Sequence, residues 1–344
     1  MRMSATIATI ACTTLVFNCS YAQQGDNVSA RVMMIHHPLT AHRYEFSALA
    51  KWKNKILLIP QDCKNVVDSI FMIDSSEIEK VLADANAKAA ISSFAIKNIR
   101  HDPADKHVLF IGNTTIENYD GFEAAVVKQD TIFFSLEGER SLCYLVKGVI
   151  NPDSKTVTLL EDTLHVPDTY DSIDNAGYES IALLPQTDSL ISFFECNKDT
   201  LHARAFMCAT TLRAPLKPIA FSTSLYFRLT DTYAINANEV IGINHLFTSK
   251  SYPYERDAYI KCENLIDVEN QLTNRGTIDT CFTQIVKLTL ADGKLHWRAL
   301  AFISLDCSDN YEGIVGFKDG ALMIVDGEPG NNPCKLVYVS LKSL

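Results

Sequence analysis

The chain has 344 residues, of which 47% are hydrophobic and 21% are charged, and its formal net charge is −10. This is the composition of a folded globular protein, so a mainly disordered chain is excluded. The acidic balance and the lack of a basic run in the sequence argue against nucleic acid as a partner. We expect instead a divalent cation and a small-molecule, glycan or protein ligand.

The N-terminal residues 1–22 have the pattern of a secretory signal peptide. Arg2 supplies the positive charge, a short apolar region follows, and Ser20-Tyr21-Ala22 fits the small-x-small cleavage rule. Cleavage after Ala22 predicts a secreted or periplasmic protein. Lipoprotein anchoring at Cys19 is the less favoured alternative, because the residues before it match a lipidation box poorly. No other stretch of the sequence is long and apolar enough for a transmembrane segment.

A two-strand unit recurs along the remaining chain, residues 23–344. Each copy opens with a polar residue, usually Glu after Tyr or Phe. An apolar run, a turn and a second apolar run follow, and the second run ends in an acid or an amide. The copies span residues 44–61, 122–137, 178–195, 230–244 and 311–326. Two strands of about six residues joined by a short turn fit this length, so each copy is predicted to be a β-hairpin.

Two more strands are predicted after each of the first four hairpins. They are Ser69–Ile73 and Ala90–Ile96, Cys143–Ile150 and Thr156–Leu160, Leu201–Cys208 and Lys217–Ser222, and Phe282–Leu290 and Leu295–Ile303. A helix over 77–86, capped by Ser75 or Ser76, is expected inside the first pair. Only Lys335–Leu341 follows the last hairpin, so the N-terminal segment Ala30–Ile35 is expected to supply the missing strand.

These elements predict an all-β fold, a five-bladed β-propeller of four-stranded blades closed by the N-terminal strand. Six blades are the alternative. Residues 23–344 would then form a single domain, because a closed ring has no free strand edges at which to divide. The long polar segment 249–280 is expected to be an insertion in the fourth blade, either a plain surface loop or a lid over one face.

The polar residues at the hairpin ends define a candidate site. In a propeller the first strand of each blade lines the central channel, so the first acids would surround its mouth. We expect these inner acids to bind metal: Glu45, Glu123, Glu179, Asp231 and Glu312. The antiparallel partner strands would place a second, ligand-binding set just behind them: Gln61, Glu137, Glu195, Asn244 and Asp326.

Carboxylates crowded around one channel raise each other's pKa or require a cation. Ca²⁺ suits such a ring, because it takes six to eight oxygen ligands in flexible geometry. Mg²⁺ or Mn²⁺ fits less naturally, and the absence of His and Cys from the inner set disfavours Zn²⁺. The alternative is that each acid accepts hydrogen bonds from nearby backbone N–H groups and has only an architectural role.

The repeated unit resembles the phytase-like, or esterase-like, β-propeller family of exported bacterial proteins. The resemblance rests on pairs such as Phe122-Glu123 with Leu136-Glu137, and it covers most of residues 43–341. It implies a propeller with an acidic, cation-binding channel. The fourth copy departs from the pattern, with Asp231 in place of Glu and Asn244 in place of an acid.

Two functions follow from this reading. The favoured one is a non-catalytic binding module that uses a Ca²⁺-containing channel to hold an extracytoplasmic ligand. The alternative is a metal-dependent phosphoesterase or esterase that uses the same site. The alternative needs a cation near the metal to neutralise phosphate, and Arg140 is the best candidate in the sequence. His245, beside Asn244, is a candidate acid or base at the same rim.

Overall fold

The structure is a computed structural model that describes the chain in segments. They are residues 26–27, 30–34, 45–61, 69–84, 87–105, 107–138, 142–166, 177–195, 204–213, 215–223, 225, 227–246, 282–303, 310–326 and 334–341. The predicted signal peptide with Cys19, the 249–280 segment and Arg140 lie outside the described residues. Within the described part the chain is nearly all β-strand, as predicted.

The predicted hairpins are confirmed. They are β3 (Phe46–Trp52) with β4 (Lys55–Pro60), β10 (Tyr119–Lys128) with β11 (Thr131–Gly138), β14 (Ser180–Leu184) with β15 (Ser189–Phe193), β18 (Arg228–Ala234) with β19 (Glu239–Leu246), and β22 (Asn310–Phe317) with β23 (Gly320–Asp326). Turn residues Lys53, Gln129 and Lys318 have φ of 55°, 58° and 51°. Tight hairpin turns require this left-handed backbone, which explains why polar residues occupy the turns.

Each of the first four hairpins is extended outward by the two strands that follow it. These strands are β5 (Ser69–Asp74) and β6 (Ile91–Lys97), β12 (Leu142–Asn151) and β13 (Thr156–Val166), β16 (Ala205–Ala209) and β17 (Lys217–Phe221), and β20 (Phe282–Ala291) and β21 (Lys294–Phe302). The last hairpin is extended by β24 (Lys335–Ser340) and then by β2 (Ala30–Met34), which pairs antiparallel with β24. The predicted use of the N-terminal segment as an outer strand is therefore confirmed.

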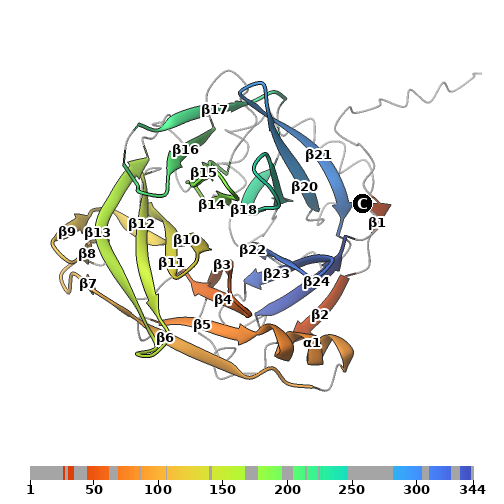
Figure 1. The fold of residues 1–344 in the computed structure, drawn as a ribbon, viewed down its shortest axis with the longest axis horizontal. Helices are drawn as coiled ribbons and strands as arrows, with labels where there is room; N and C mark the ends of the chain where they lie inside the picture. The colour runs from red at the N-terminus through yellow and green to blue at the C-terminus, as the bar shows by residue number, and fades with distance from the viewer. Residues whose placement is uncertain are drawn as a thin grey trace, which may run out of the picture.

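The hairpins are arranged around a ring, seen face-on in Figure 1. Their first strands contact one another in the cyclic order β3, β10, β14, β18, β22 and back to β3. Neighbouring groups are also joined at the periphery, where β13 pairs with β6 and β17 pairs with β21, both parallel. The fold is thus all-β and propeller-like, with the starts of the inner strands brought together near its centre.

Several details of the periphery differ from the sequence prediction. Helix α1 (Ser75–Ala83) begins two residues earlier than expected, and its N-cap is Asp74, so the predicted cap at Ser75 or Ser76 is wrong. The Asp74 carboxylate makes no cap bond, because it accepts hydrogen bonds from Lys55 at 2.7 Å and Asn54 at 3.2 Å. Among the described residues, no helix has the length and apolar character needed to cross a membrane.

Four short strands were not predicted. Three form a small sheet, β7 (Ile99–His101), β8 (Leu109–Ile111) and β9 (Thr114–Ile116). The fourth, β1 (Asp26–Asn27), pairs parallel with β21. Each has only two or three residues, which is too short to show a hydrophobic period in the sequence.

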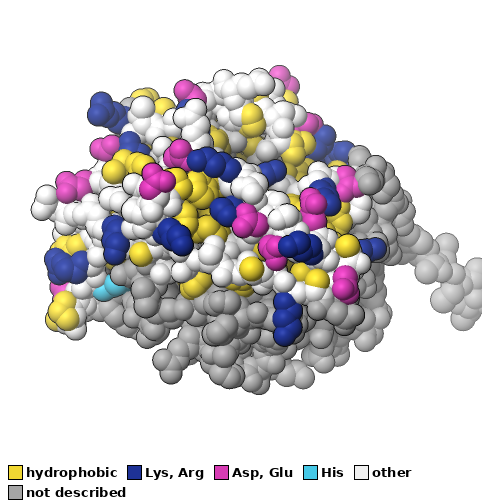
Figure 2. All heavy atoms as spheres, turned by 60° about the horizontal axis from the view of Figure 1, so that its bottom comes forward, with side chains coloured by type: hydrophobic (Ala, Val, Ile, Leu, Met, Phe, Trp, Pro, Cys, Tyr) yellow, Lys and Arg dark blue, Asp and Glu magenta, His cyan; other side chains and the backbone are white. Residues whose placement is uncertain are grey.

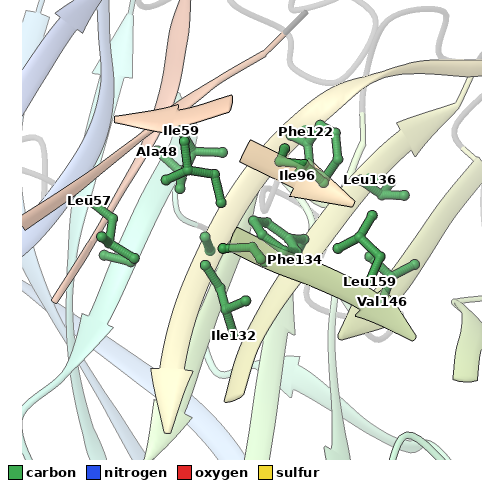
Figure 3. Packing of buried hydrophobic residues seen from close by; sticks show 14 of the residues in the cluster. Ala48, Leu57, Ile59, Ile96, Phe122, Ile132, Phe134, Leu136, Val146 and Leu159 are labelled. Atoms are coloured by element: carbon green, nitrogen blue, oxygen red, sulfur yellow. The ribbon is translucent and has the colours of Figure 1, made fainter. Parts of the chain in front are cut away.

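The core lies between neighbouring four-stranded groups of the ring. Figure 3 shows one such contact, in which Leu57 and Ile59 of β4 pack beside Ile132 and Phe134 of β11. All four side chains are at most 2% exposed. Every residue of β4 after Lys55 is buried, which explains why the strand is a continuous apolar run and does not alternate. Burial of each such side chain stabilises the fold by about 1.5–3 kcal/mol.

The outer surface carries mixed charge. On the face shown in Figure 2, Lys and Arg side chains lie beside Asp and Glu side chains, with apolar and polar atoms between them. The described residues of this face therefore present alternating charge and no block of one sign.

Candidate functional site

β-Bulges set which side chains the inner strands direct toward the site. A bulge places one extra residue in a strand and re-aims the neighbouring side chains. β10 has two extra residues, Asp120 and Glu123, and β22 has Glu312. The extra residue is Ser47 in β3 and Thr230 in β18. Glu45 and Asp231 therefore do not occupy the position of Glu123 in their strands.

In β3 and β18 the bulge residue links one inner strand to the next. Thr230 Oγ1 donates a hydrogen bond to the Tyr311 carbonyl at 2.7 Å, and Ser47 Oγ donates to the Phe122 carbonyl. Both hydroxyls are buried. At these two points of the ring a hydroxyl–backbone bond takes the place of a carboxylate.

Asp231 connects three inner strands through backbone donors. Its carboxylate is fully buried and accepts hydrogen bonds from the N–H groups of Ile314 and Thr232, both at 2.8 Å, and of Leu49. Burial raises its pKa well above the usual value even though these three donors lower it. The strands approach so closely here that a Cβ on Gly313 would lie 2.7 Å from the Leu49 nitrogen. Asp231 thus has the bonding pattern of an architectural acid.

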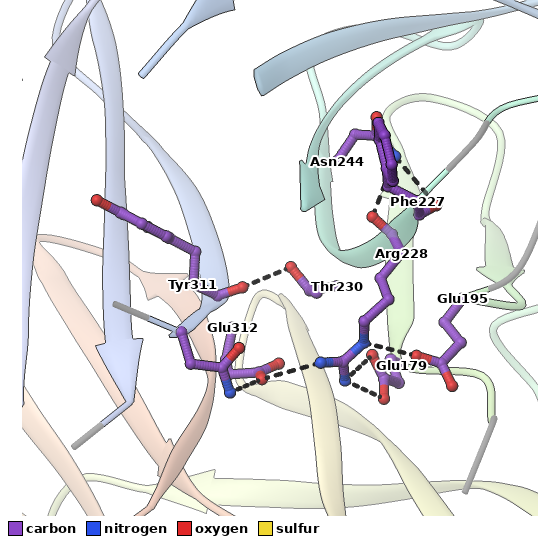
Figure 4. Close-up of polar contacts among 9 residues, drawn as sticks. Glu179, Glu195, Phe227, Arg228, Thr230, Asn244, Tyr311 and Glu312 are labelled. Atoms are coloured by element: carbon purple, nitrogen blue, oxygen red, sulfur yellow. Dashed lines mark hydrogen bonds and ion pairs between the residues drawn. The ribbon is translucent and has the colours of Figure 1, made fainter. Parts of the chain in front are cut away.

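Arg228, at the start of β18, joins three acids from three other strands or their ends (Figure 4). Its Nη2 donates to both oxygens of Glu179, at 2.8 and 3.0 Å, and its Nε donates to Glu195 at 2.7 Å. Its Nη1 lies 3.7 Å from Glu312 Oε1, and Asn310 also donates to that oxygen. The side chains of Arg228 and Glu179 are both 6% exposed, so these are buried, charge-assisted contacts.

Two further acids lie on the β10–β11 side of Arg228. Gln61 Nε2 donates to Glu123 Oε1 at 3.0 Å. Burial, together with the carboxylates of Glu137, Glu179 and Glu312, raises the pKa of Glu123 well above its usual value. Burial, with Glu179 and Asp120, raises the pKa of Glu137 to about 8, although Arg228 opposes the shift. We call the set formed by Glu123, Glu137, Glu179, Glu195 and Glu312 around Arg228 the acidic cluster.

Two glycines leave room for the acidic cluster. A Cβ on Gly177 would lie 2.5 Å from Glu137 Oε1, and a Cβ on Gly121 would lie 2.6 Å from Glu123 Oε1. Each glycine stands two residues before an acid of the cluster, in Gly-Phe-Glu at 121–123 and Gly-Tyr-Glu at 177–179. The glycines let a carboxylate lie against the backbone of an inner strand.

Asn244 holds the backbone that carries Arg228. Its Nδ2 donates to the Phe227 and Arg228 carbonyls, each at 3.1 Å, and its Oδ1 accepts from Gln284 Nε2 at 2.6 Å. His245, the next residue, pairs in register with Arg228. Its buried ring lies 2.8 Å from Thr283 Oγ1 and packs edge-on against Tyr311. The structure therefore places both residues beside the Arg228 backbone, on the side away from its guanidinium group.

Of the ten residues predicted for the site, five meet in the acidic cluster and Gln61 contacts it. Asp231 and Asn244 are bonded to the backbone as described. The Glu45 carbonyl accepts from the Gln61 N–H at 2.8 Å. The Asp326 backbone pairs with Asn310, and its side chain is outside the described part.

Sequence reasoning missed Arg228, the central cation of the site. It lies two residues before the fourth copy, in which Asn244 stands in place of the closing acid. A set of buried like charges requires a counter-ion, and the loss of acid from one repeat beside an arginine was the available signal.

The cluster offers oxygen donors, the ligands that Ca²⁺ prefers. Buried carboxylates with raised pKa are what a bound cation would stabilise. Among the described residues, no group of three or more His, Cys, Asp or Glu side chains is already arranged as a metal site. The oxygen donors of the cluster are of the type that Ca²⁺ prefers, but the described residues do not form a complete coordination shell.

Comparisons with known proteins give structural similarity at low sequence identity. No family model and no curated protein matches the chain. The structure is similar to a β-xylosidase named RS223, with TM-score 0.47, 8% identity, and coverage of 90% of this chain and 94% of that chain. It is similar to a DUF4221 family member from Bacteroides vulgatus, with TM-score 0.41, 11% identity, and coverage of 91% and 96%.

A third similar structure is a GH43_1 enzyme from Xanthomonas citri, with TM-score 0.45, 8% identity, and coverage of 89% of this chain and 90% of that chain. Similarity at this level says nothing of activity, because one fold hosts many functions. The resemblance to the phytase-like family stays a prediction.

Proposed function

We propose that this chain is an exported five-bladed β-propeller that binds an extracytoplasmic ligand, and that its acidic cluster holds one divalent cation, for which Ca²⁺ is the best match. The observation that carries the proposal is the charge of the cluster. Among the described residues, five buried or nearly buried carboxylates surround one guanidinium, Arg228.

The cluster divides into acids that accept close hydrogen bonds from Arg228 and acids that do not. Glu179 and Glu195 form close hydrogen bonds to Arg228. Glu123 and Glu137 have pKa values raised by burial and by neighbouring acids. These two, with Glu312, are the residues that would hold the cation. When bound, Ca²⁺ would neutralise them and offer coordination positions to oxygen atoms of a small molecule, glycan or protein.

The test is calcium binding to chelator-treated protein, measured by titration calorimetry and by the melting temperature in Ca²⁺ and in EDTA. We expect one site per chain, and its loss in the double variant Glu123→Gln/Glu137→Gln. Glu161→Gln is the matched control, since Glu161 is an exposed acid of β13 outside the cluster. A wild-type chain with no bound divalent cation and the same melting temperature in both buffers would contradict the proposal.

The second candidate is a hydrolase acting on a phosphoester or another ester. Its support is Glu137, because a carboxyl group whose pKa is about 8 holds a proton at neutral pH and is suited to general-acid work. Arg228 weighs against a phosphoester, because its hydrogen bonds are directed at Glu179 and Glu195 and not at an open position. Turnover of a generic phosphoester by the calcium-loaded chain would favour this candidate over the binding module.

A further inference from the structure

The positive charge of Arg228 lies among the carboxylates of the acidic cluster, where a bound cation could also lie. Its guanidinium contacts carboxylates from three directions, Glu179, Glu195 and Glu312, and the first two contacts are 3.0 Å or shorter. The Arg228 side chain is 6% exposed and that of Glu195 is 0% exposed. A buried carboxylate without a counter-charge is strongly unfavourable, so this arginine does for Glu179 and Glu195 what a metal ion would do.

The chain holds Arg228 in place by contacts behind it. Asn244 donates to the Phe227 and Arg228 carbonyls, and Gln284 fixes the Asn244 amide at 2.6 Å. The Leu229 N–H donates to the Glu195 carbonyl at 3.0 Å, which ties the arginine's own strand to the residue that it neutralises. A guanidinium fixed at its base and met by a bidentate carboxylate at its tip has little freedom to move aside for a ligand.

Among the described residues, the opposite side of the cluster has no comparable fixed charge. Glu123 accepts a hydrogen bond from the neutral amide of Gln61, and Glu137 lies against the backbone at Gly177. The charged groups facing these two acids are other acids and Arg228: Glu179, Glu195, Glu312, Asp120 and Arg228.

We infer that Arg228 is the specificity-determining residue of the acidic cluster, a built-in counter-ion that closes Glu179 and Glu195 to ligands and limits the cluster to one divalent cation on the Glu123–Glu137 side. The number of cations in the wild-type chain rests on the proposed function. The role of Arg228 toward Glu179 and Glu195 does not.

The experiment compares the wild-type chain with Arg228→Met after removal of metal and addition of CaCl₂ alone. Calcium content is measured by elemental analysis, and melting temperature is measured in Ca²⁺ and in EDTA. We expect one calcium per wild-type chain and two per Arg228→Met chain. We also expect the variant to melt lower than wild type in EDTA and to regain most of that loss in Ca²⁺.

A merely structural arginine would lower the melting temperature equally in both buffers and leave the calcium content unchanged, and that result would overturn the inference. The variant Arg228→Met/Glu179→Gln/Glu195→Gln removes the acids along with the arginine. It should regain stability in EDTA and bind no more calcium than wild type.

If Arg228→Met does not fold in either buffer, the inference is tested with the double variant Arg228→Met/Glu195→Gln. It keeps Glu179 as an acid without its counter-ion, so calcium should raise its melting temperature more than that of the triple variant. Equal responses would overturn the inference. A wild-type chain without calcium beside an Arg228→Met chain that binds it would refute the proposed function and leave the role of Arg228 standing.

Discussion

Two kinds of buried acid lie near the centre of the ring, and they are stabilised in different ways. Asp231 receives hydrogen bonds from three backbone N–H groups that belong to three strands. Glu123 and Glu137 have mainly other carboxylates around them, with one amide donor from Gln61. Burial and acidity are common to both groups. They differ in their hydrogen-bond donors. Asp231 is bonded to backbone N–H groups and holds the ring together, whereas Glu123 and Glu137 lack such donors among the contacts described and favour a cation.

The comparison explains why buried acids near the centre of the ring serve two purposes. A backbone N–H is a fixed donor that no ligand can displace without breaking the strand arrangement, so Asp231 is committed to the fold. Carboxylates that face other carboxylates are stabilised by any positive charge that arrives. Arg228 is a charge of this kind supplied by the chain itself.

The largest effect is expected from Asp231→Ala, which leaves three buried N–H groups without their acceptor. The free energy of unfolding should fall by about 3–5 kcal/mol, because each unsatisfied buried donor costs about 1–3 kcal/mol. Denaturant unfolding in Ca²⁺ and in EDTA measures it, and the loss should be the same in both. Asp188→Ala is the control, since its ion pair with Lys128 is on the surface. A loss that calcium reverses would mean that Asp231 belongs to the cation site.

A second effect is expected from pH in the absence of divalent cations. The Glu137 pKa is about 8 in the folded chain and near 4.5 when unfolded, so between these values the folded chain retains a proton that the unfolded chain has lost. Its contribution to stability is complete below pH about 4.5 and is lost as the pH rises through about 8. Glu123 and Glu195, also with raised pKa values, add in the same direction.

Unfolding free energy measured from pH 5 to 9 in EDTA should therefore decrease with pH, by up to about 1.4 kcal/mol per pH unit for each titrating group. Glu137→Gln should flatten the curve and Glu161→Gln should not. A rise in stability over this range would show that the cluster acids are ionised in the folded chain.

The smallest effect on stability is expected from Gly177→Ala. Its Cβ would meet only the end of the Glu137 side chain, at 2.5 Å, so the carboxylate can move aside at a cost of about 1 kcal/mol. The displaced Glu137 should weaken calcium binding at least tenfold by calorimetry, while the melting temperature in EDTA changes little. Unchanged calcium affinity would exclude Glu137 from the cation site.

The strand plan could be read from the sequence because its signals are local. Apolar runs separated by polar turns at Lys53, Gln129 and Lys318 fix each hairpin without reference to the rest of the chain. The pairing of the N-terminal segment with β24 also followed, since one outer strand was missing.

The site could be predicted only in part, because its details depend on register and on long-range contacts. The bulge residue is Glu123 in β10 and Thr230 in β18, so Thr230 takes the place that the sequence repeat gives to Asp231. The donors to Asp231 include Ile314, which is far away in the chain. Arg228 likewise acquires its role only when Glu179 and Glu195 are brought to it by folding.

The pairing of β2 with β24 has a consequence for how the protein is made. Val32 is aligned with Val337, so the first strand of this sheet leaves the ribosome long before its partner exists. Contacts between such distant segments form late, because the intervening chain must first be ordered. During synthesis β2 must wait with an open edge, the kind of surface that chaperones shield and that aggregates when left exposed. Completion of this sheet thus marks the end of maturation.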